Sequence, residues 1–498
     1  MTPLRPTDAR RAGVLAHPTS LPGPFGQGDL GPATHAFVAR LAAAGQRLWQ
    51  VLPLGPPGYG GSPYAAASAF AGDPLLISPE RLVDRGLLPA QVLERRFPEG
   101  AVAGEASAWR RDLLRQACAT FHADKSPDDQ RAFAAWREAE RDWLAPYALF
   151  TALRRAEGEA AHWTWPRARR PLPHQRQALR AELALAVEDA ALEQWLFAEQ
   201  WDALLAHAHA HGVEVMGDAP IFVARDSADV WAQPELFLLD AHGEPEVIAG
   251  VPPDYFSPEG QRWGNPLYDW AVHARTGYAW WVERMRQAFA RHDWVRIDHF
   301  RGFASYWEVP ASAETAVDGR WVPGPGPALF AAIEEALGPQ GIVAEDLGEL
   351  TPDVPALLEV TGFPGMKVLQ FAWDEEQGAE HPFLPANYPE DGRCVVYTGT
   401  HDNQTTAGWY AGLDAKTKRL VDQGVPGDDK VWGLLELGWR SRAFMALAPL
   451  QDLLGLGDEA RLNTPGKAEG NWAWRATPAQ LDALPWERLR ELTQASER

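Results

Sequence analysis

Eight short apolar runs, each containing or followed by polar residues, place the strongest constraint on how this chain folds. Helix-like stretches such as residues 276–292 and 327–339 lie between most of them. Near-continuous apolar strands that alternate with helices are typical of a parallel sheet covered by helices, and eight such units predict a (β/α)8 TIM barrel of the α/β class. A doubly wound open sheet is the alternative. The runs are GVLAHPT (13–19), RLWQVLPL (47–54), VEVMGDAPI (213–221), WVRIDHF (294–300), GIVAEDL (341–347), MKVLQFAW (366–373), RCVVYTGTHD (393–402) and MALAPLQDLLG (445–455).

The runs are unevenly spaced, which indicates insertions into one large domain. Roughly 160 residues separate the second run from the third, and much of residues 70–205 has the amphipathic pattern of helices, as at 128–159. Residues 225–275 have little helical pattern and many Pro, Gly and aromatic residues. We therefore expect a single catalytic barrel domain over 1–498, with a helical insertion subdomain at 70–205 and a loop-rich insertion at the barrel mouth at 225–275.

The composition narrows the classes of partner. A net charge of −21 and a pI near 5.1 argue against nucleic acid or an anionic membrane, because both need a clustered basic surface, and favour a neutral substrate. The two cysteines, Cys118 and Cys394, lie in no metal-binding or disulfide spacing. Neither a signal peptide nor a run of about 18 apolar residues is found, so we expect a cytoplasmic protein.

Polar residues cluster where the predicted strands end. In a barrel of parallel strands these ends converge on one rim, where the active sites of such folds are built. Several strands with the same feature therefore predict a shared active site. The residues concerned are His17, Thr19, Asp218, Arg296, Asp298, His299, Glu345, Asp346, Thr400, His401 and Asp402.

Three of these carboxylates, Asp298, Glu345 and Asp402, stand out as candidates for catalysis. Carboxylates on neighbouring strands can lie ~5 Å apart, the separation that retaining glycosidases use to divide nucleophile from acid/base. Arg296, two residues before Asp298 and on the same face, favours an ionised Asp298. Glu345 follows the apolar residues 343–344, and an apolar setting raises the pKa of a carboxyl group and keeps it protonated as an acid.

Aromatic residues give a second indication of a sugar ligand. Sugar rings commonly lie on aromatic faces, and the chain has 23 Trp and 10 Tyr. Most of the Trp residues in helical sequence are expected to serve packing. Tyr59 and Tyr64 in GPPGYGGSPY and Trp263 in GQRWGNP lie instead in Gly/Pro loops that are expected to overhang the barrel rim and contact ligand.

The chain resembles a known family, the 4-α-glucanotransferases called amylomaltases or disproportionating enzymes, which are relatives of the α-amylases. The matching segments run in order from His17 to Arg475. The resemblance implies a (β/α)8 barrel with inserted subdomains and without a C-terminal β-domain. The segments are HPTSLPGPFGQGDLG, WQVLPLGPPGYGGSPYAAASAFAGDP, GDAPIFVARDSADVW, AGVPPDYFSPEGQRWGNPLYDW, VRIDHFRGFASYWEVP, VAEDLG, PGMKVLQFAW, TGTHDNQTTAGW and LNTPGKAEGNWAWR.

The resemblance also implies roles for individual residues. The family's nucleophile corresponds to Asp298, its acid/base to Glu345 and its third carboxylate to Asp402. The implied substrate-binding residues are Arg296, His401, Asp218, Tyr64, Trp263, Tyr59 and Ser62, with Tyr64 and Trp263 as lid aromatics. The sequence departs from the family pattern at Gly61, where an acidic residue is usual, and at Ala65 and Ala66, where polar residues are frequent; these departures concern the acceptor subsites.

The implied reaction is transfer of α-1,4-glucan segments to the 4-hydroxyl of an acceptor by retaining double displacement, with cyclic glucans as products of intramolecular transfer. The implied substrates are maltooligosaccharides and starch or glycogen-type α-glucans, and no cofactor, metal, nucleic acid or membrane is expected. Three alternatives remain at this stage: a hydrolase with the same residues, a metal-dependent barrel enzyme using Asp298, His299, Glu345 and Asp402, and a non-catalytic glucan-binding scaffold.

Overall fold

The computed structural model describes residues 10–97, 103–124, 126–166, 169, 176–253, 257–348, 350–467 and 469–498. Over these ranges no helix is both long enough and apolar enough to cross a membrane.

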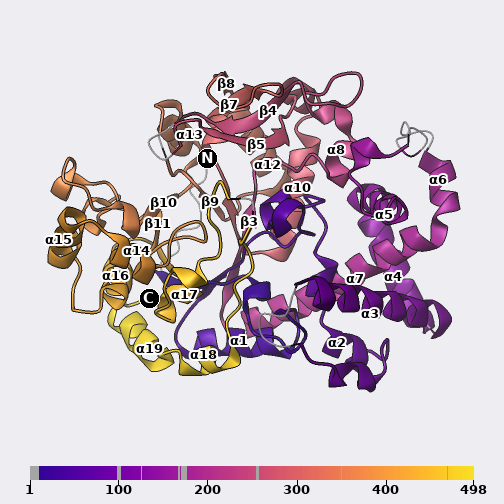
Figure 1. Ribbon diagram of the computed structural model, residues 1–498, viewed down its shortest axis with the longest axis horizontal. Helices are drawn as coiled ribbons and strands as arrows, with labels where there is room; N and C mark the ends of the chain where they lie inside the picture. Colours follow the sequence, from indigo (N-terminus) through magenta and orange to yellow (C-terminus); the bar gives the residue numbers. More distant parts are fainter. Residues whose placement is uncertain are drawn as a thin grey trace.

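Eight parallel strands form one sheet that curls into a nearly closed barrel (Figure 1). Each of the eight predicted runs contains all or most of one strand. The strand order β10-β11-β12-β1-β2-β3-β6-β9 runs around the barrel, so the (β/α)8 fold is confirmed and the open-sheet alternative is wrong. The strands are β1 (Arg11–Leu15), β2 (Leu48–Gln50), β3 (Glu214–Ala219), β6 (Trp294–Ile297), β9 (Ile342–Ala344), β10 (Gly365–Val368), β11 (Cys394–Tyr397) and β12 (Met445–Pro449).

The barrel closes between β9 and β10, the two ends of this sheet order, without a regular ladder. One backbone bond joins the two sides, from the N–H of Ala344 to the carbonyl of Pro364 at 2.9 Å. A second link uses a side chain, because the N–H of Met366 donates to Oδ1 of Asp346 at 2.7 Å. The Asp346 carboxylate therefore takes the place of a missing ladder acceptor at this seam.

A set of helices lies between β2 and β3, within the range where the sequence predicts a helical insertion (Figure 1, right). Within the range 70–205, positions 98–102, 125, 167–168 and 170–175 lie outside the described residues, and the boundaries of a separate subdomain stay a prediction. The helices are α2 (Pro79–Asp84), α3 (Ala103–Asp124), α4 (Pro127–Ala139), α5 (Arg141–Ala156), α6 (Arg176–Glu182) and α7 (Ala184–Ala210).

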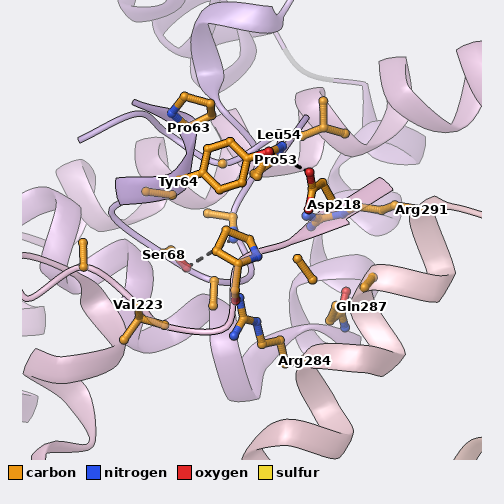
Figure 2. A pocket seen from close by; sticks show the side chains of 18 of the residues that line it. Pro53, Leu54, Pro63, Tyr64, Ser68, Asp218, Val223, Arg284, Gln287 and Arg291 are labelled. Atoms are coloured by element: carbon orange, nitrogen blue, oxygen red, sulfur yellow. Dashed lines mark hydrogen bonds between the residues drawn. The ribbon is translucent and has the colours of Figure 1, made fainter. Parts of the chain in front are cut away.

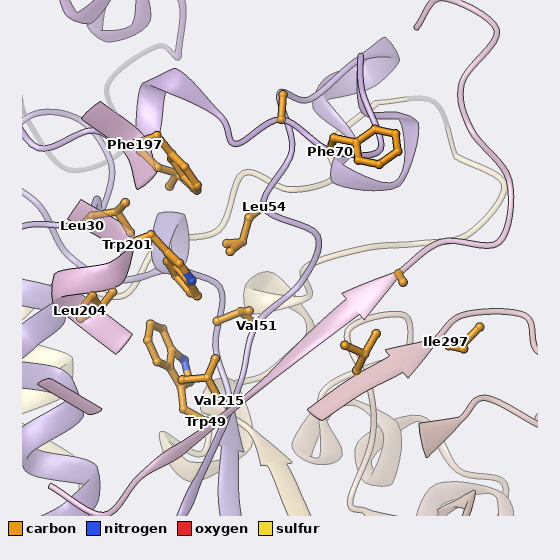
Figure 3. Packing of buried hydrophobic residues seen from close by; sticks show 14 of the residues in the cluster. Leu30, Trp49, Val51, Leu54, Phe70, Phe197, Trp201, Leu204, Val215 and Ile297 are labelled. Carbon is orange, nitrogen blue, oxygen red and sulfur yellow. The ribbon is translucent and has the colours of Figure 1, made fainter. Parts of the chain in front are cut away.

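The barrel strands turn their side chains alternately toward two buried layers. Met216 and Leu447 belong to the cluster that fills the barrel interior, whereas Trp49 and Val215 belong to the larger core shared with the helices. Figure 3 shows Trp49 and Val215 beside Trp201 of α7. Strands buried on both sides explain why the sequence runs are almost continuously apolar.

The insertion expected to be loop-rich, at 225–275, contains two strands. β4 (Val247–Val251) and β5 (Gln261–Pro266) join β7 (Ser305–Pro310) and β8 (Arg320–Pro323) in an antiparallel sheet of order β5-β4-β7-β8. Sequence reading missed this sheet because β4 pairs with β7, which follows β6 in the chain. Residues 254–256 of the insertion lie outside the described residues.

The remaining helices lie between strands of the barrel or follow its last strand, β12. In the described part of the chain after β12, residues 450–467 and 469–498 form helices and turns and contain no strand. The helices of the chain that are not named above are α1 (Pro32–Ala43), α8 (Ala228–Ala232), α9 (Trp270–Arg275), α10 (Ala279–Arg291), α11 (Arg301–Ala304), α12 (Pro327–Leu337), α13 (Asp353–Thr361), α14 (Thr406–Gly412), α15 (Ala415–Gly424), α16 (Lys430–Arg440), α17 (Leu450–Leu453), α18 (Pro478–Ala483) and α19 (Trp486–Ala495).

Candidate active site

The carboxyl ends of β3, β6, β9 and β11 bring the predicted site residues to one rim of the barrel. Asp298 follows β6 directly and Glu345 follows β9, and these two strands are hydrogen-bonded neighbours. Asp402 lies in the loop after β11. The short strands end at the rim, so polar side chains that would be costly to bury within the sheet instead face a shared space.

Arg296 links two of the rim carboxylates. Its Nη1 donates to both oxygens of Asp218, at 2.8 and 2.7 Å, and its Nη2 donates to Oδ1 of Asp298 at 2.9 Å. Arg296 and Asp218 face each other because they are paired in the register of β3 and β6. Arg296 is only 3% exposed and the side chain of Asp218 is fully buried, so the guanidinium charge is shared between two carboxylates inside the protein.

Glu345 has a different environment from Asp298. Its Oε2 accepts from the N–H of His299 at 2.8 Å and its Oε1 accepts from the N–H of Leu347 at 2.9 Å. Burial raises the pKa of Glu345 to about 7, with Arg296 opposing the rise and Asp298 adding to it. The direction agrees with the expectation from its apolar neighbours, so near neutral pH the carboxyl group is available as a proton donor.

His299 holds a backbone conformation that favours glycine. Its φ is +50°, an uncommon value for a residue with a side chain. In this conformation its backbone N–H points at Glu345, and its ring packs edge-on against Trp263 with centroids 4.7 Å apart. Such strain is typical of functional sites, and this backbone role of His299 could not be predicted from the sequence.

Tyr64 and His401 form an aromatic pair on the other side of the rim. Their rings are stacked, with centroids 5.1 Å apart and an interplanar angle of 14°. The Tyr64 hydroxyl donates to Oδ2 of Asp218 at 2.7 Å, and burial raises its pKa well above the usual value, so it stays a donor. His401 Nε2 lies 3.3 Å from Oδ1 of Asp402. Tyr64 is therefore fixed in the network instead of lying free above it.

The other predicted aromatic residues lie further out. Trp263, in β5, is 38% exposed, and Tyr59 is 83% exposed and projects toward solvent. Ser62 caps the turn that carries Tyr64, because its Oγ accepts from the N–H of Tyr64 at 3.2 Å. The structure therefore joins Trp263 to the rim through His299 and leaves Tyr59 at the periphery.

The segment at residues 462–475 matches the family pattern, but none of its residues was predicted to belong to the site. Asn463 donates from Nδ2 to Oδ1 of Asp402 at 2.6 Å. The ring of Trp472 lies 5.8 Å from that of Tyr64 and 6.0 Å from that of His401. The polar and aromatic residues of this loop were the available signal. In the sequence, however, the loop is far from the strands that carry the carboxylates.

A cavity of about 80 Å³ lies behind Tyr64 and Asp218 (Figure 2). One wall is a face of α10 that carries Arg284, Gln287 and Arg291 at helical spacing. The three catalytic candidates do not line this cavity. At roughly 10–15 Å³ for each water centre, it has room for a few water molecules next to Asp218.

In the described ranges, no group of three or more His, Cys, Asp or Glu side chains is arranged to hold a metal ion. The arrangement instead pairs an arginine-bound carboxylate, Asp298, with a buried carboxyl of raised pKa, Glu345. Two carboxyl groups in such unequal surroundings are suited to nucleophilic attack and proton transfer at a glycosidic bond.

Comparisons with known proteins point in one direction. A family model described as 4-alpha-glucanotransferase matches residues 16–481. The chain is 51% identical to a 4-alpha-glucanotransferase of Thermus thermophilus, over 98% of this chain and 99% of that protein. It is 46% identical to one of Synechocystis sp., over 95% of each. Among solved structures, the amylomaltase of Streptococcus agalactiae in complex with acarbose superposes with a TM-score of 0.93 at 35% identity, over 98% of this chain and 99% of that chain.

Proposed function

Because the chain belongs to the 4-alpha-glucanotransferase family, and is therefore an enzyme that transfers α-1,4-glucan segments, we propose that Asp298, Glu345 and Asp402 carry out the transfer. Asp298 is the nucleophile, Glu345 is the acid/base, and Asp402 binds the sugar at the cleaved bond.

The proposed reaction has two displacements. In the first, Glu345 donates its proton to the glycosidic oxygen while Asp298 attacks C1, which forms a covalent glucosyl ester and releases the reducing-end fragment. In the second, Glu345, now a carboxylate, takes the proton from the 4-hydroxyl of an acceptor glucan as that oxygen attacks C1. Asp298 leaves as a carboxylate, and the configuration at C1 is retained.

The observation that carries this assignment is the unequal setting of the two carboxyl groups. Asp298 accepts a charge-assisted bond from Arg296 at 2.9 Å, which holds and orients its carboxylate for attack. Glu345 is buried, and its pKa of about 7 leaves a protonated fraction near neutral pH. The reverse assignment would require the group with the raised pKa to attack as a carboxylate, which the environment disfavours.

We assign supporting roles to the rest of the rim. Asp402 and His401 hold ring hydroxyls of the sugar next to the cleaved bond, and the bond to the 2-hydroxyl strengthens as the transition state develops. Trp263 covers the acceptor side and shields the covalent intermediate from water. The substrates are maltooligosaccharides and longer starch or glycogen-type glucans, and acarbose, the ligand of the S. agalactiae amylomaltase, is expected to bind at the same rim.

The test separates the two carboxyl groups by role. Glu345→Gln lacks the proton donor, so cleavage of maltooligosaccharides should fall by about 10² to 10⁴. α-Maltosyl fluoride needs little protonation of its leaving group, so this variant should still form the ester, and a covalent adduct on Asp298 should accumulate because no base activates the acceptor. Asp298→Asn should form no adduct. Intact-mass spectra after brief exposure to the fluoride decide the matter: an adduct in Asp298→Asn, but not in Glu345→Gln, would reverse the two roles.

A transferase and a hydrolase could use the same residues. The two are distinguished by the products from maltotriose. A transferase yields longer maltooligosaccharides together with glucose, whereas a hydrolase yields only shorter sugars.

A further inference from the structure

The loop that carries Asp402 is held from the far end of the chain, by a short segment that follows β12. The backbone N–H of Asn463 donates to the carbonyl of His401 at 3.2 Å. Nη2 of Arg461 donates to the backbone carbonyl of Asp402 at 2.7 Å, and its Nε donates to the carbonyl of Asn463 at 2.8 Å. The first two bonds hold the backbone of His401 and Asp402, and the third orders the Arg461 side chain that makes one of them.

One further bond reaches the carboxylate itself. Nδ2 of Asn463 donates to Oδ1 of Asp402 at 2.6 Å, and His401 Nε2 lies 3.3 Å from the same oxygen. Both contacts are to Oδ1, and the Asp402 side chain is 41% exposed. The carboxylate is therefore anchored through Oδ1, and Oδ2 accepts no hydrogen bond from the residues that the structure describes.

We infer that Asn463 is a positioning residue that sets the orientation in which Asp402 meets the sugar hydroxyls. This inference rests on the proposed role of Asp402. An amide N–H is suited to the task because it donates to a carboxylate without adding a charge that would compete with the sugar. Without this bond, Asp402 could turn about its side-chain torsions, and both its oxygens would be free to hydrogen-bond to water.

Loss of the bond from Asn463 to Asp402 should destabilise the transition state more than the bound substrate. If the bond from Asp402 to a ring hydroxyl strengthens as positive charge develops on the sugar, a misplaced carboxylate lowers kcat more than it raises KM. Loss of one charge-assisted bond corresponds to about a 10- to 100-fold fall in kcat.

The chain offers a matched control in the same loop. Asn471 also uses its side chain to hold the loop: its Nδ2 donates to the carbonyl of Lys467 at 2.9 Å, and its Oδ1 accepts from the N–H of Thr464 at 2.9 Å. None of these bonds reaches Asp402. Asn471→Leu therefore perturbs the loop without removing the contact with the carboxylate.

The experiment is a double-mutant cycle on Asn463 and Asp402, with transfer from maltotriose as the assay and thermal unfolding as the check on folding. Asn463→Leu, of similar size but without a donor, should lower kcat by about 10- to 100-fold with little change in KM. Asn463→Gln keeps an amide donor and should recover part of the loss. In the Asp402→Asn background the same leucine substitution should cost less than about threefold, because the group that it positions is already gone.

Three results would overturn the inference while leaving the proposed function intact. The first is a fully additive cycle, the second is a loss in Asn471→Leu equal to that in Asn463→Leu, and the third is a full-rate Asn463→Leu beside a slow Asp402→Asn. If Asp402→Asn itself transfers at the full rate, then the proposed role of Asp402 fails, and the inference about Asn463 fails with it.

Discussion

Replacing Arg296 by Gln tests the electrostatic basis of the site, because this side chain contacts two carboxylates and lies near a third. The substitution removes the 2.9 Å bond to Asp298 and both bonds to Asp218. A hydrogen bond to a charged group contributes about 1.5–3 kcal/mol, so transfer should slow by roughly 10- to 100-fold. A buried carboxylate left without its partner costs about 3–5 kcal/mol of stability, and we expect a folded variant with a lower denaturation midpoint.

The pH profile gives the sharper signature of this variant. The positive charge of Arg296 opposes the rise in the pKa of Glu345 that burial causes, so its removal raises that pKa above its present value of about 7. A general acid works while it is protonated, that is, below its pKa. The basic limb of kcat/KM for transfer from maltotriose should therefore move to higher pH in Arg296→Gln, even though the maximum rate is lower.

The assay is kcat/KM measured from about pH 5 to pH 9, with urea denaturation of the same samples. The control is Arg110→Met, which also removes a buried arginine, but one that is paired with Asp29 and bonds to none of the rim carboxylates. The control should keep the parent pH profile. A basic limb that stays in place, or moves to lower pH, in Arg296→Gln would refute the electrostatic account of Glu345.

Two further outcomes follow from the geometry. Trp263→Ala should raise the ratio of hydrolysis to transfer. The Trp263 ring packs edge-on against His299, and in its proposed lid role its loss admits water to the covalent intermediate. Product analysis with maltotriose measures the ratio, and an unchanged ratio and rate would count against the lid. Arg110→Met should lower the free energy of unfolding by about 3–5 kcal/mol, because Arg110 is paired with Asp29 at 2.8 Å in a buried site. The activity of the folded enzyme should change little. A loss below about 1 kcal/mol in urea denaturation would contradict this prediction.

The barrel and its rim could be predicted because the signals are local in the sequence. Each strand is a short apolar run, and Asp298 and Glu345 stand at the positions that follow β6 and β9. The alternation of strand and helix is enough to place such residues on one rim. Carboxyl ends of parallel strands must converge, so no knowledge of exact strand register was needed.

Features that depend on register or on distant segments could not be predicted. The bonds from Nη1 of Arg296 to both oxygens of Asp218 need the register of β3 against β6, which neither run reveals alone. The β4–β7 pairing joins strands on opposite sides of β6 in the sequence. Asn463 reaches Asp402 across 61 positions. In each case tertiary packing determines which residue or strand is the partner, and the local sequence does not indicate it.

The seam between β9 and β10 determines where the barrel opens locally. The other neighbouring strands of the barrel are joined by parallel ladders of hydrogen bonds. Between β9 and β10, the structure shows one backbone bond from Ala344 and one bond to the Asp346 carboxylate. Local opening of a protein begins where the fewest such bonds must break. Amide hydrogens along this seam should exchange with solvent sooner than those between β1 and β12, so the strand that delivers Glu345 can loosen while the rest of the barrel stays shut.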